Sequence, residues 1–302
     1  MDLYVTNTTD AQMLTQLRHL NATLNEAQRQ VASGKKVEVA SDAPADVQSI
    51  VQNQSDLARV QQSEANLNKL NSEVGMASTV LEGAAKLMDS ARSIGAQGAS
   101  DTSDSSTRQL LASQIQDIEA QMVGIADSAN AGRYLFAGDA DATAPYAIDF
   151  ANTPPFTANT TALATRQGMD SMGNTFPIAM TATDIFNNAT AGNNVMQSLE
   201  DLRQGLLKGD DAAINTANSS LASAAAHLGS VQAYYGTAQR TITSALDVAS
   251  KSELSLQSNL SDLTSADMAE AITAEQSAQT QQQAVLSMRA KMSRGSLFDM
   301  LG

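Results

Sequence analysis

The fold follows from a stretch near the amino end, residues 10–34, which reads DAQMLTQLRHLNATLNEAQRQVASG. Its apolar residues recur in alternating steps of four and three, at Met13, Leu17, Leu20, Leu24, Ala27 and Val31. This spacing keeps one narrow apolar stripe on one side of a helix, as in a coiled coil. Asp10 is placed as an N-cap and Gly34 as a C-cap, so we predict a helix of about 23 residues between them.

The other end of the chain repeats this pattern. Residues 241–263 carry one apolar stripe, interrupted only by Glu253, and residues 271–292 continue it through Val285, Met288 and Met292. We expect a helix cap in the break at 264–267, and we predict further helices at about residues 45–97, 107–129 and 193–207, with Gly95, Gly98 and the run ASDTSDSST at residues 99–107 separating the first two. Stripes this narrow cannot form a globular core alone, so the terminal helices must pair with each other or with other chains.

The middle of the chain has a different composition. Seven of the eleven aromatic residues and four of the five prolines lie between residues 134 and 186. Helix-breaking proline and strand-favouring aromatics in one window indicate a compact β-rich unit. The predicted fold is therefore mainly α, a long antiparallel helical bundle or coiled-coil rod with a small inserted β-rich domain.

Composition excludes several classes of function. The 302 residues include no cysteine and two histidines, so disulfides, thiolate metal sites and cysteine nucleophiles are ruled out. The net charge of −14 argues against a nucleic-acid surface. No apolar run is long enough to span a bilayer, so we expect no membrane insertion and no cleaved secretion signal. Residues 1–40 carry four acidic and four basic side chains and so have no net charge. The excess of acidic residues therefore lies away from this end of the chain.

No pattern in the sequence predicts catalysis, a cofactor or a metal. Phosphate-binding glycine loops and nucleophile motifs are absent from the sequence, and neither His19 nor His227 has a partner at ligand spacing. The aspartates of the middle segment lack the alternating spacing of a calcium loop, so we interpret them as a solvated acidic surface. We therefore expect a protein that is not an enzyme.

Two motifs lie at predicted joints between elements. Residues 33–44 read SGKKVEVASDAP, which predicts a helix stop at Gly34, a short extended stretch, and Ser41 or Asp42 capping a new helix with Pro44 in its first turn. Residues 130–138 read NAGRYLFAG, which predicts a helix end followed by a hairpin. Its motif positions are Gly132, Arg133, Tyr134, Phe136 and Gly138.

At these motifs the sequence resembles the bacterial flagellin superfamily, and within it the proteins of the hook-filament junction. The first motif is similar to the family's Gly-basic-basic and Ser-Asp-x-Pro pattern, and the second to its Gly-Arg-Tyr-hydrophobic-Phe-small-Gly signature. The terminal residues 296–301, SLFDML, are a third point of similarity. Pro44 favours the junction proteins, because filament flagellins usually have a different residue at this position.

The resemblance implies an organisation and a set of partners. It places a terminal coiled-coil domain at residues 1–40 plus 265–302, a helical rod domain at 41–137 plus 193–264, and an outward-facing β-rich insertion at 138–192. It implies a structural adaptor that forms a ring between hook and filament and allows filament assembly. The expected partners are copies of itself, the adjacent hook-associated junction protein, flagellin and an export chaperone, and the expected route is the flagellar type III apparatus.

We define the assembly seam as the stripe residues expected to contact neighbouring copies: Met13, Leu17, Leu20, Leu24, Val31, Val285, Met288 and Met292. We expect them to be only partly buried in a monomer, and the terminal helices to be marginal in isolation. Three alternatives remain open. The chain is a filament or minor flagellin, its insertion binds carbohydrate or carries an enzymatic activity, or it is an unrelated coiled-coil scaffold.

Overall fold

The computed structural model of the chain describes residues 2–100, 103–159, 165–190 and 192–298, with side chains inside these ranges from residue 11 to residue 288. The chain divides into two compact units, Met1–Ala58 with Glu253–Gly302, and Arg59–Ser252. The first unit therefore contains both chain ends, and the second contains the middle of the chain. The three-domain division implied by the resemblance stays a prediction.

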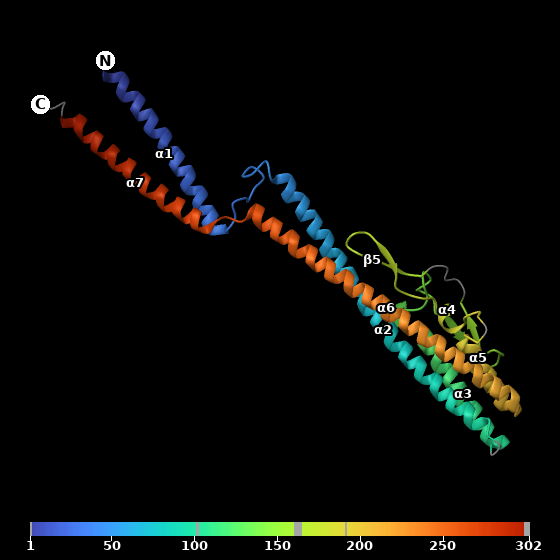
Figure 1. The fold of residues 1–302 in the computed structure, drawn as a ribbon. Helices are drawn as coiled ribbons and strands as arrows, with labels where there is room; N and C mark the ends of the chain where they lie inside the picture. Colours follow the sequence, from blue (N-terminus) through green and yellow to red (C-terminus); the bar gives the residue numbers. More distant parts are fainter. Residues whose placement is uncertain (1, 101–102, 160–164, 191, 299–302) are drawn as a thin grey trace. The chain divides into compact units, whose positions relative to one another are not determined.

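The first unit is built around two long helices, α1 (Asp2–Ser33) and α7 (Met268–Phe298), which pack against each other (Figure 1). Gly34 ends α1 as predicted, with a φ of 70° and its N–H donating to the Gln30 carbonyl oxygen at 2.8 Å. The prediction that Asp10 caps α1 is wrong, because the helix continues to Asp2. Pairing with α7 overrides the local capping signal in deciding where α1 begins.

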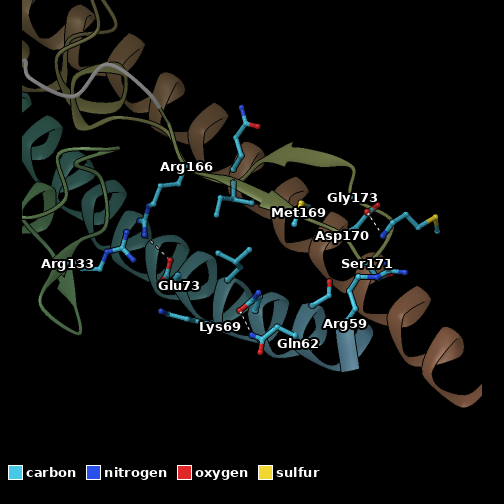
Figure 2. A pocket seen from close by; sticks show the side chains of 16 residues that line it. Arg59, Gln62, Lys69, Glu73, Arg133, Arg166, Met169, Asp170, Ser171 and Gly173 are labelled. Atoms are coloured by element: carbon cyan, nitrogen blue, oxygen red, sulfur yellow. Dashed lines mark hydrogen bonds and ion pairs between the residues drawn. The ribbon is translucent and has the colours of Figure 1, made fainter. Parts of the chain in front are cut away.

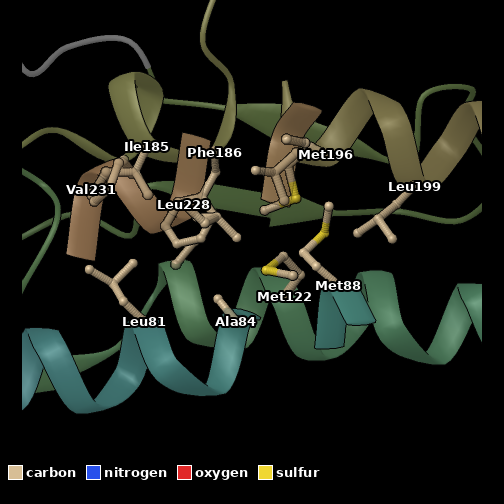
Figure 3. Close-up of a cluster of buried hydrophobic side chains, with 14 of the residues drawn as sticks. Leu81, Ala84, Met88, Met122, Ile185, Phe186, Met196, Leu199, Leu228 and Val231 are labelled. Atoms are coloured by element: carbon tan, nitrogen blue, oxygen red, sulfur yellow. The ribbon is translucent and has the colours of Figure 1, made fainter. Parts of the chain in front are cut away.

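In the second unit, four of the helices pack around one core. They are α2 (Val47–Gly98), α3 (Ser105–Ala126), α5 (Val195–Lys208) and α6 (Asp211–Thr264), with α2 and α6 extending beyond the unit. Figure 3 shows the buried side chains of these helices meeting, among them Leu81, Met88, Met122, Leu199 and Leu228. The mainly helical fold with a small β-containing part is confirmed.

Short polar residues and glycines set the ends of these helices. Asp104 caps α3 by accepting from the Thr107 N–H at 2.7 Å, and Asn194 caps α5 by accepting from the Gln197 N–H at 2.9 Å. Gly209 ends α5 in the left-handed region, at a φ of 65°. Asp210 then accepts from the Ala213 N–H at 3.0 Å and caps α6.

Of the predicted separators of α2 and α3, the run that begins at Ala99 marks the end of α2, whereas Gly95 and Gly98 belong to α2. Their role is close packing. A Cβ atom on Gly98 would lie 2.2 Å from Leu206 Cδ2, so glycine lets α5 approach the end of α2. The break follows Gly98, and Asp104, which belongs to the predicted run, caps α3.

The aromatic-rich segment forms three separate two-stranded antiparallel sheets and a short helix, α4 (Ala182–Phe186). The strand pairs are β1 (Ala129–Asn130) with β2 (Arg133–Tyr134), β3 (Tyr146–Ile148) with β4 (Phe156–Ala158), and β5 (Gln167–Met169) with β6 (Thr175–Pro177). The buried aromatics of this segment join the core of the helices. The segment therefore packs as part of the second unit, without a core of its own.

Candidate assembly surface

The first motif forms a hydrogen-bonded joint between the two ends of the chain. After Gly34, the Lys36 N–H donates to the Thr264 carbonyl oxygen at 2.8 Å, and the Ala266 N–H donates to the Gly34 carbonyl oxygen at 3.0 Å. Lys36 Nζ also donates to the Asp262 carbonyl oxygen at 3.1 Å. These contacts tie the end of α1 to the segment between α6 and α7, so the joint holds the end of α1 beside the start of α7.

Asp42 shapes the loop of this joint. Its Oδ2 accepts from the backbone N–H groups of Glu38 and Val39, both at 3.0 Å, and these hydrogen bonds lower the pKa of the carboxyl. The prediction that Ser41 or Asp42 caps the next helix is therefore wrong. The Asp42 carboxylate is used to fold the chain backward, and α2 begins later, at Val47, after a turn that contains Pro44.

The paired helices of the first unit bury few large apolar side chains. Among the described side chains of these helices, the buried residues are Leu20, which is 8% exposed, and Ala27 in α1, and Ala271 and Ala278 in α7. Between the helices, Gln282 Nε2 donates to Asn21 Oδ1 at 2.7 Å. Such an interface of alanines and side-chain amides buries little apolar area per helix turn, so it adds little stability.

The residues of the assembly seam differ in how far their side chains are buried. Met13, Leu17, Leu24, Val31 and Val285 are half-buried, Leu20 is buried, and Met288 is 60% exposed. The Met292 side chain lies outside the described residues. The seam therefore still has apolar surface to offer, although Leu20 is already used within the chain.

Further apolar residues of this unit are exposed outside the predicted seam. Leu14 in α1 and Ile272 and Leu286 in α7 are all exposed. Sequence reasoning missed them because they interrupt the steps of three and four, although each directly neighbours a seam or stripe position. A second apolar surface lies at the joint, where Val37, Val39, Val47, Val51 and Leu260 line a groove of about 620 Å³.

The second motif is a structural joint of the second unit. Ala131 and Gly132 take positive φ values of 51° and 79° in the tight turn between β1 and β2. Arg133 forms an ion pair with Asp141, while Tyr134 is half-buried. Phe136 is fully buried and packs edge to face against Phe186 and Tyr235, with ring centroids 5.9 Å and 6.2 Å away.

The other end of this motif is also anchored. The Ala182 N–H donates to the Phe136 carbonyl oxygen at 2.7 Å, which fixes the start of α4. Gly138 is buried with a φ of 57°. The motif therefore attaches the inserted segment to the bundle, and of its named side chains Arg133 is the exposed one.

One buried charged cluster lies between α3 and α5. Arg203 Nη2 lies 2.7 Å from Glu200 Oε2, and Arg203 Nε lies 3.3 Å from Glu119 Oε2. Burial and the neighbouring Glu200 carboxylate raise the pKa of Glu119 to about 8, although Arg203 acts in the opposite direction. Two carboxylates thus share one guanidinium, and Glu119 holds a proton at neutral pH.

The described residues contain no cluster of three or more His, Cys, Asp or Glu side chains arranged to hold a metal ion. His227 Nε2 lies 2.9 Å from the Asp184 carbonyl oxygen, and His19 is exposed. In the part of the chain that the structure covers, no helix has the length and apolar character that crossing a membrane requires.

Comparisons with known proteins give the family and the fold. A model of the bacterial flagellin N-terminal helical region matches residues 5–141, and one of the bacterial flagellin C-terminal helical region matches residues 212–301. These matches include both motifs and both terminal helices. No curated protein sequence matches the chain.

Several solved structures are similar in fold. A protein described as flagellar hook-associated, from Vibrio parahaemolyticus, has a TM-score of 0.67 at 17% identity, covering 74% of this chain and 100% of its own. FlgL of Bacillus cereus has a TM-score of 0.55 at 16% identity, with coverages of 71% and 100%. The flagellar junction protein FlgL of Legionella pneumophila has a TM-score of 0.53 at 13% identity, with coverages of 66% and 100%.

Proposed function

The chain belongs to the bacterial flagellin family, and from this we propose that it is a structural adaptor at the junction between hook and filament of the flagellum. Copies assemble there as a ring onto which flagellin adds. The observation that carries the proposal is the fold, because solved proteins described as hook-associated or as flagellar junction proteins are covered over their whole length. The role is structural and not catalytic.

The exposed apolar surface of the chain ends supports assembly through α1 and α7. Leu14, Leu286 and Met288 are exposed, and most described seam residues are half-buried. Burial of apolar surface is the main driving force of protein association. The seam, together with Leu14 and Leu286, is therefore our proposed contact with neighbouring copies.

The remaining partners and the route follow from the family resemblance. The ring contacts the adjacent hook-associated junction protein on one side and flagellin on the other. The chain leaves the cell through the flagellar type III apparatus, with an export chaperone holding the carboxy-terminal helix before export. Residues 1–40 plus 265–302 form the inner coiled-coil domain, 41–137 plus 193–264 the rod, and 138–192 the outward-facing insertion.

Electron microscopy of flagella from cells that lack this gene tests the proposal, with secreted proteins assayed in parallel. We expect hooks without filaments and flagellin lost into the medium. Restoring the gene should restore the filaments. Normal hooks and filaments in the deletion strain would contradict the junction role.

A filament flagellin is the second candidate, because the matching family models describe flagellin helical regions in general. The two candidates differ in what the purified chain does alone. A filament flagellin should polymerise into long filaments when seeded with filament fragments, whereas a junction protein should stop at short assemblies. Long filaments of this chain alone would favour the second candidate.

A further inference from the structure

A groove of about 820 Å³ lies in the second unit between α2 and the β5–β6 hairpin (Figure 2). Its lining includes four cationic side chains, Arg59, Lys69, Arg133 and Arg166, and two acidic ones, Glu73 and Asp170. We call it the basic groove. Arg166 is paired with Glu73 and Arg133 with Asp141, and the lining still has more basic than acidic side chains on a chain whose net charge is −14.

The groove has rigid walls. Arg166 Nη1 donates to Glu73 Oε2 and Arg166 Nη2 to the Leu135 carbonyl oxygen, both at 2.9 Å, so the hairpin is fastened to α2 and to the second motif. At the tip of the hairpin, Asp170 accepts from the Met172 N–H at 2.9 Å and from the Asn174 N–H at 2.8 Å. A preformed surface of this kind loses little conformational entropy on binding.

The exposed members of the groove favour a macromolecular partner. Arg59, Lys69 and Arg133 are exposed, and so are Met169 and Met172 on the hairpin, the latter at 70%. Exposed methionines adapt to protein surfaces, and exposed cations select a partner of opposite charge. The groove therefore suits a protein surface that is acidic with some apolar character.

The same chain carries such a surface in its first unit. Residues 38–56 and 253–275 contain nine acidic and no basic residues, and we call them the acidic band. The joint brings the two segments together, because the Lys36 N–H donates to the Thr264 carbonyl oxygen. Glu38, Asp262 and Glu270 are exposed in the band, as are the apolar Val51 and Leu254. The two lysines of the joint, Lys35 and Lys36, are too few to offset the nine acidic residues of the band.

We propose that the basic groove of one copy binds the acidic band of a second copy of this chain. The contact joins two different surfaces, so it is heterologous, and repeated heterologous contacts produce a closed ring or an open helical array. The proposal rests on the proposed function, since it names a contact by which copies assemble. It adds a second interface to that of the terminal helices.

Carbodiimide cross-linking of the full-length chain tests the contact, because this reagent joins lysine amines directly to carboxylates. Unlabelled and 15N-labelled copies are mixed in equal amounts, so that mass spectrometry separates links between copies from links within one copy. We expect Lys69, the lysine of the groove, to be linked to carboxylates of residues 38–56 or 253–275 in the other copy. Lys86, exposed on the same helix outside the groove, is the matched control.

Charge reversal gives a second readout. Arg59→Glu with Lys69→Glu should weaken self-association at low salt by about fivefold or more in sedimentation measurements, and added salt should weaken the wild type in the same direction. The control, Lys86→Glu with Arg92→Glu, changes the net charge equally and should leave association near the wild-type level.

Three results would overturn the proposal: Lys69 links no more frequent than Lys86 links, Lys69 links to other regions, or equal loss of association in both double variants. The test of the groove contact can fail without the test of the junction role failing, and the reverse also holds. Hooks without filaments in the deletion strain, with no Lys69 links, would reject the groove contact alone. The reverse result would reject the junction role and keep the contact.

Discussion

Glu119, Glu200 and Arg203 place three ionisable side chains together in the interior of the second unit. All three are buried, and neither carboxylate oxygen of Glu119 has a hydrogen-bond partner among the described residues. Removing a carboxylate from water is costly unless hydrogen bonds or a full opposite charge replace the water. Here one guanidinium serves two carboxylates, so keeping Glu119 protonated is the less costly state.

Stability should therefore fall as pH rises across neutrality. The pKa of Glu119 is about 8 in the folded protein, against about 4.3 in an unfolded chain, so the folded state holds a proton that the unfolded state has released. The free energy of unfolding therefore begins to fall near the unfolded pKa of about 4.3 and stops falling above the folded pKa of about 8. Glu119→Gln copies the protonated form and should raise stability at pH 8.5 by roughly 1–3 kcal/mol.

Urea unfolding at pH 5.5, 7 and 8.5 measures this effect. Glu200→Gln is the control, because Glu200 accepts from Arg203 Nε at 2.8 Å and from Gln204 Nε2 at 2.9 Å, and its loss should destabilise the protein at every pH. Parallel pH profiles for the wild type and Glu119→Gln would show that Glu119 does not titrate in this range.

Two helical glycines should respond to alanine in opposite directions. Gly98→Ala places a Cβ atom 2.2 Å from Leu206 Cδ2 in the core, so we expect a loss of about 1–3 kcal/mol from overpacking. Gly124 in α3 has no atom within 4 Å of such a Cβ, so Gly124→Ala should add about 0.5–1 kcal/mol through helix propensity. Thermal unfolding of both variants checks the pair, and equal shifts would contradict it.

At the scale of elements, the sequence predicted most of the helices but, for α6, only residues 241–263 of Asp211–Thr264, and it left most of the insertion undetermined. Apolar spacing located α2, α3, α5 and α7 to within a few residues, because long periodic segments carry many repeats of the signal. Strands of two or three residues, such as β5 and β6, are too short to show a period. The short helix α4 was missed, although Thr181 and Asp184 form a recognisable cap at its start.

The two candidate surfaces differ in the same respect: the assembly seam could be predicted from the sequence, and the basic groove could not. The assembly seam is a property of one helix at a time, so its spacing was visible in the sequence. The basic groove collects Arg59, Lys69, Arg133 and Arg166 from α2, β2 and the residue before β5. No local pattern connects these positions, and the structure is needed to bring them together.

A charge at a half-buried seam position should leave the terminal helices folded but should prevent assembly. Leu17→Asp or Leu24→Asp should leave the helicity of the second unit unchanged by circular dichroism but prevent assembly, because each places a charge in the proposed contact between copies. Gln16→Asp, on the exposed side of the same helix, is the control. Loss of helicity in the second unit, or assembly as in the wild type, would contradict the prediction.

At the scale of the whole molecule, stability should reside in the second unit. Its core extends from Leu67 to Ile242, with members from α2, α3, α5, α6 and the insertion. Among its described side chains, the first unit buries a few alanines and isolated large side chains such as Leu20 and Ile50. Residues 59–252 thus contain the main hydrophobic core of the described chain.

A fragment of residues 59–252 should therefore fold alone. We expect a cooperative thermal transition within about 5 °C of the main transition of the full chain, because nearly all large buried side chains are retained. Limited proteolysis of the full chain should cut α1 and α7 first and leave a fragment of similar extent. A fragment without a cooperative transition, or terminal helices that resist protease in a verified monomer, would contradict this assignment.

The pairing of α1 with α7 also has a consequence for delivery. The two helices have 32 and 31 residues and meet at one hydrogen-bonded joint, yet they come from opposite ends of the polypeptide. Neither end can present the paired surface before the other has arrived, whichever is produced or transported first. A chain cut short before Met268 keeps its main core and loses this surface, so under the proposed function we expect truncated copies to be excluded from the assembly.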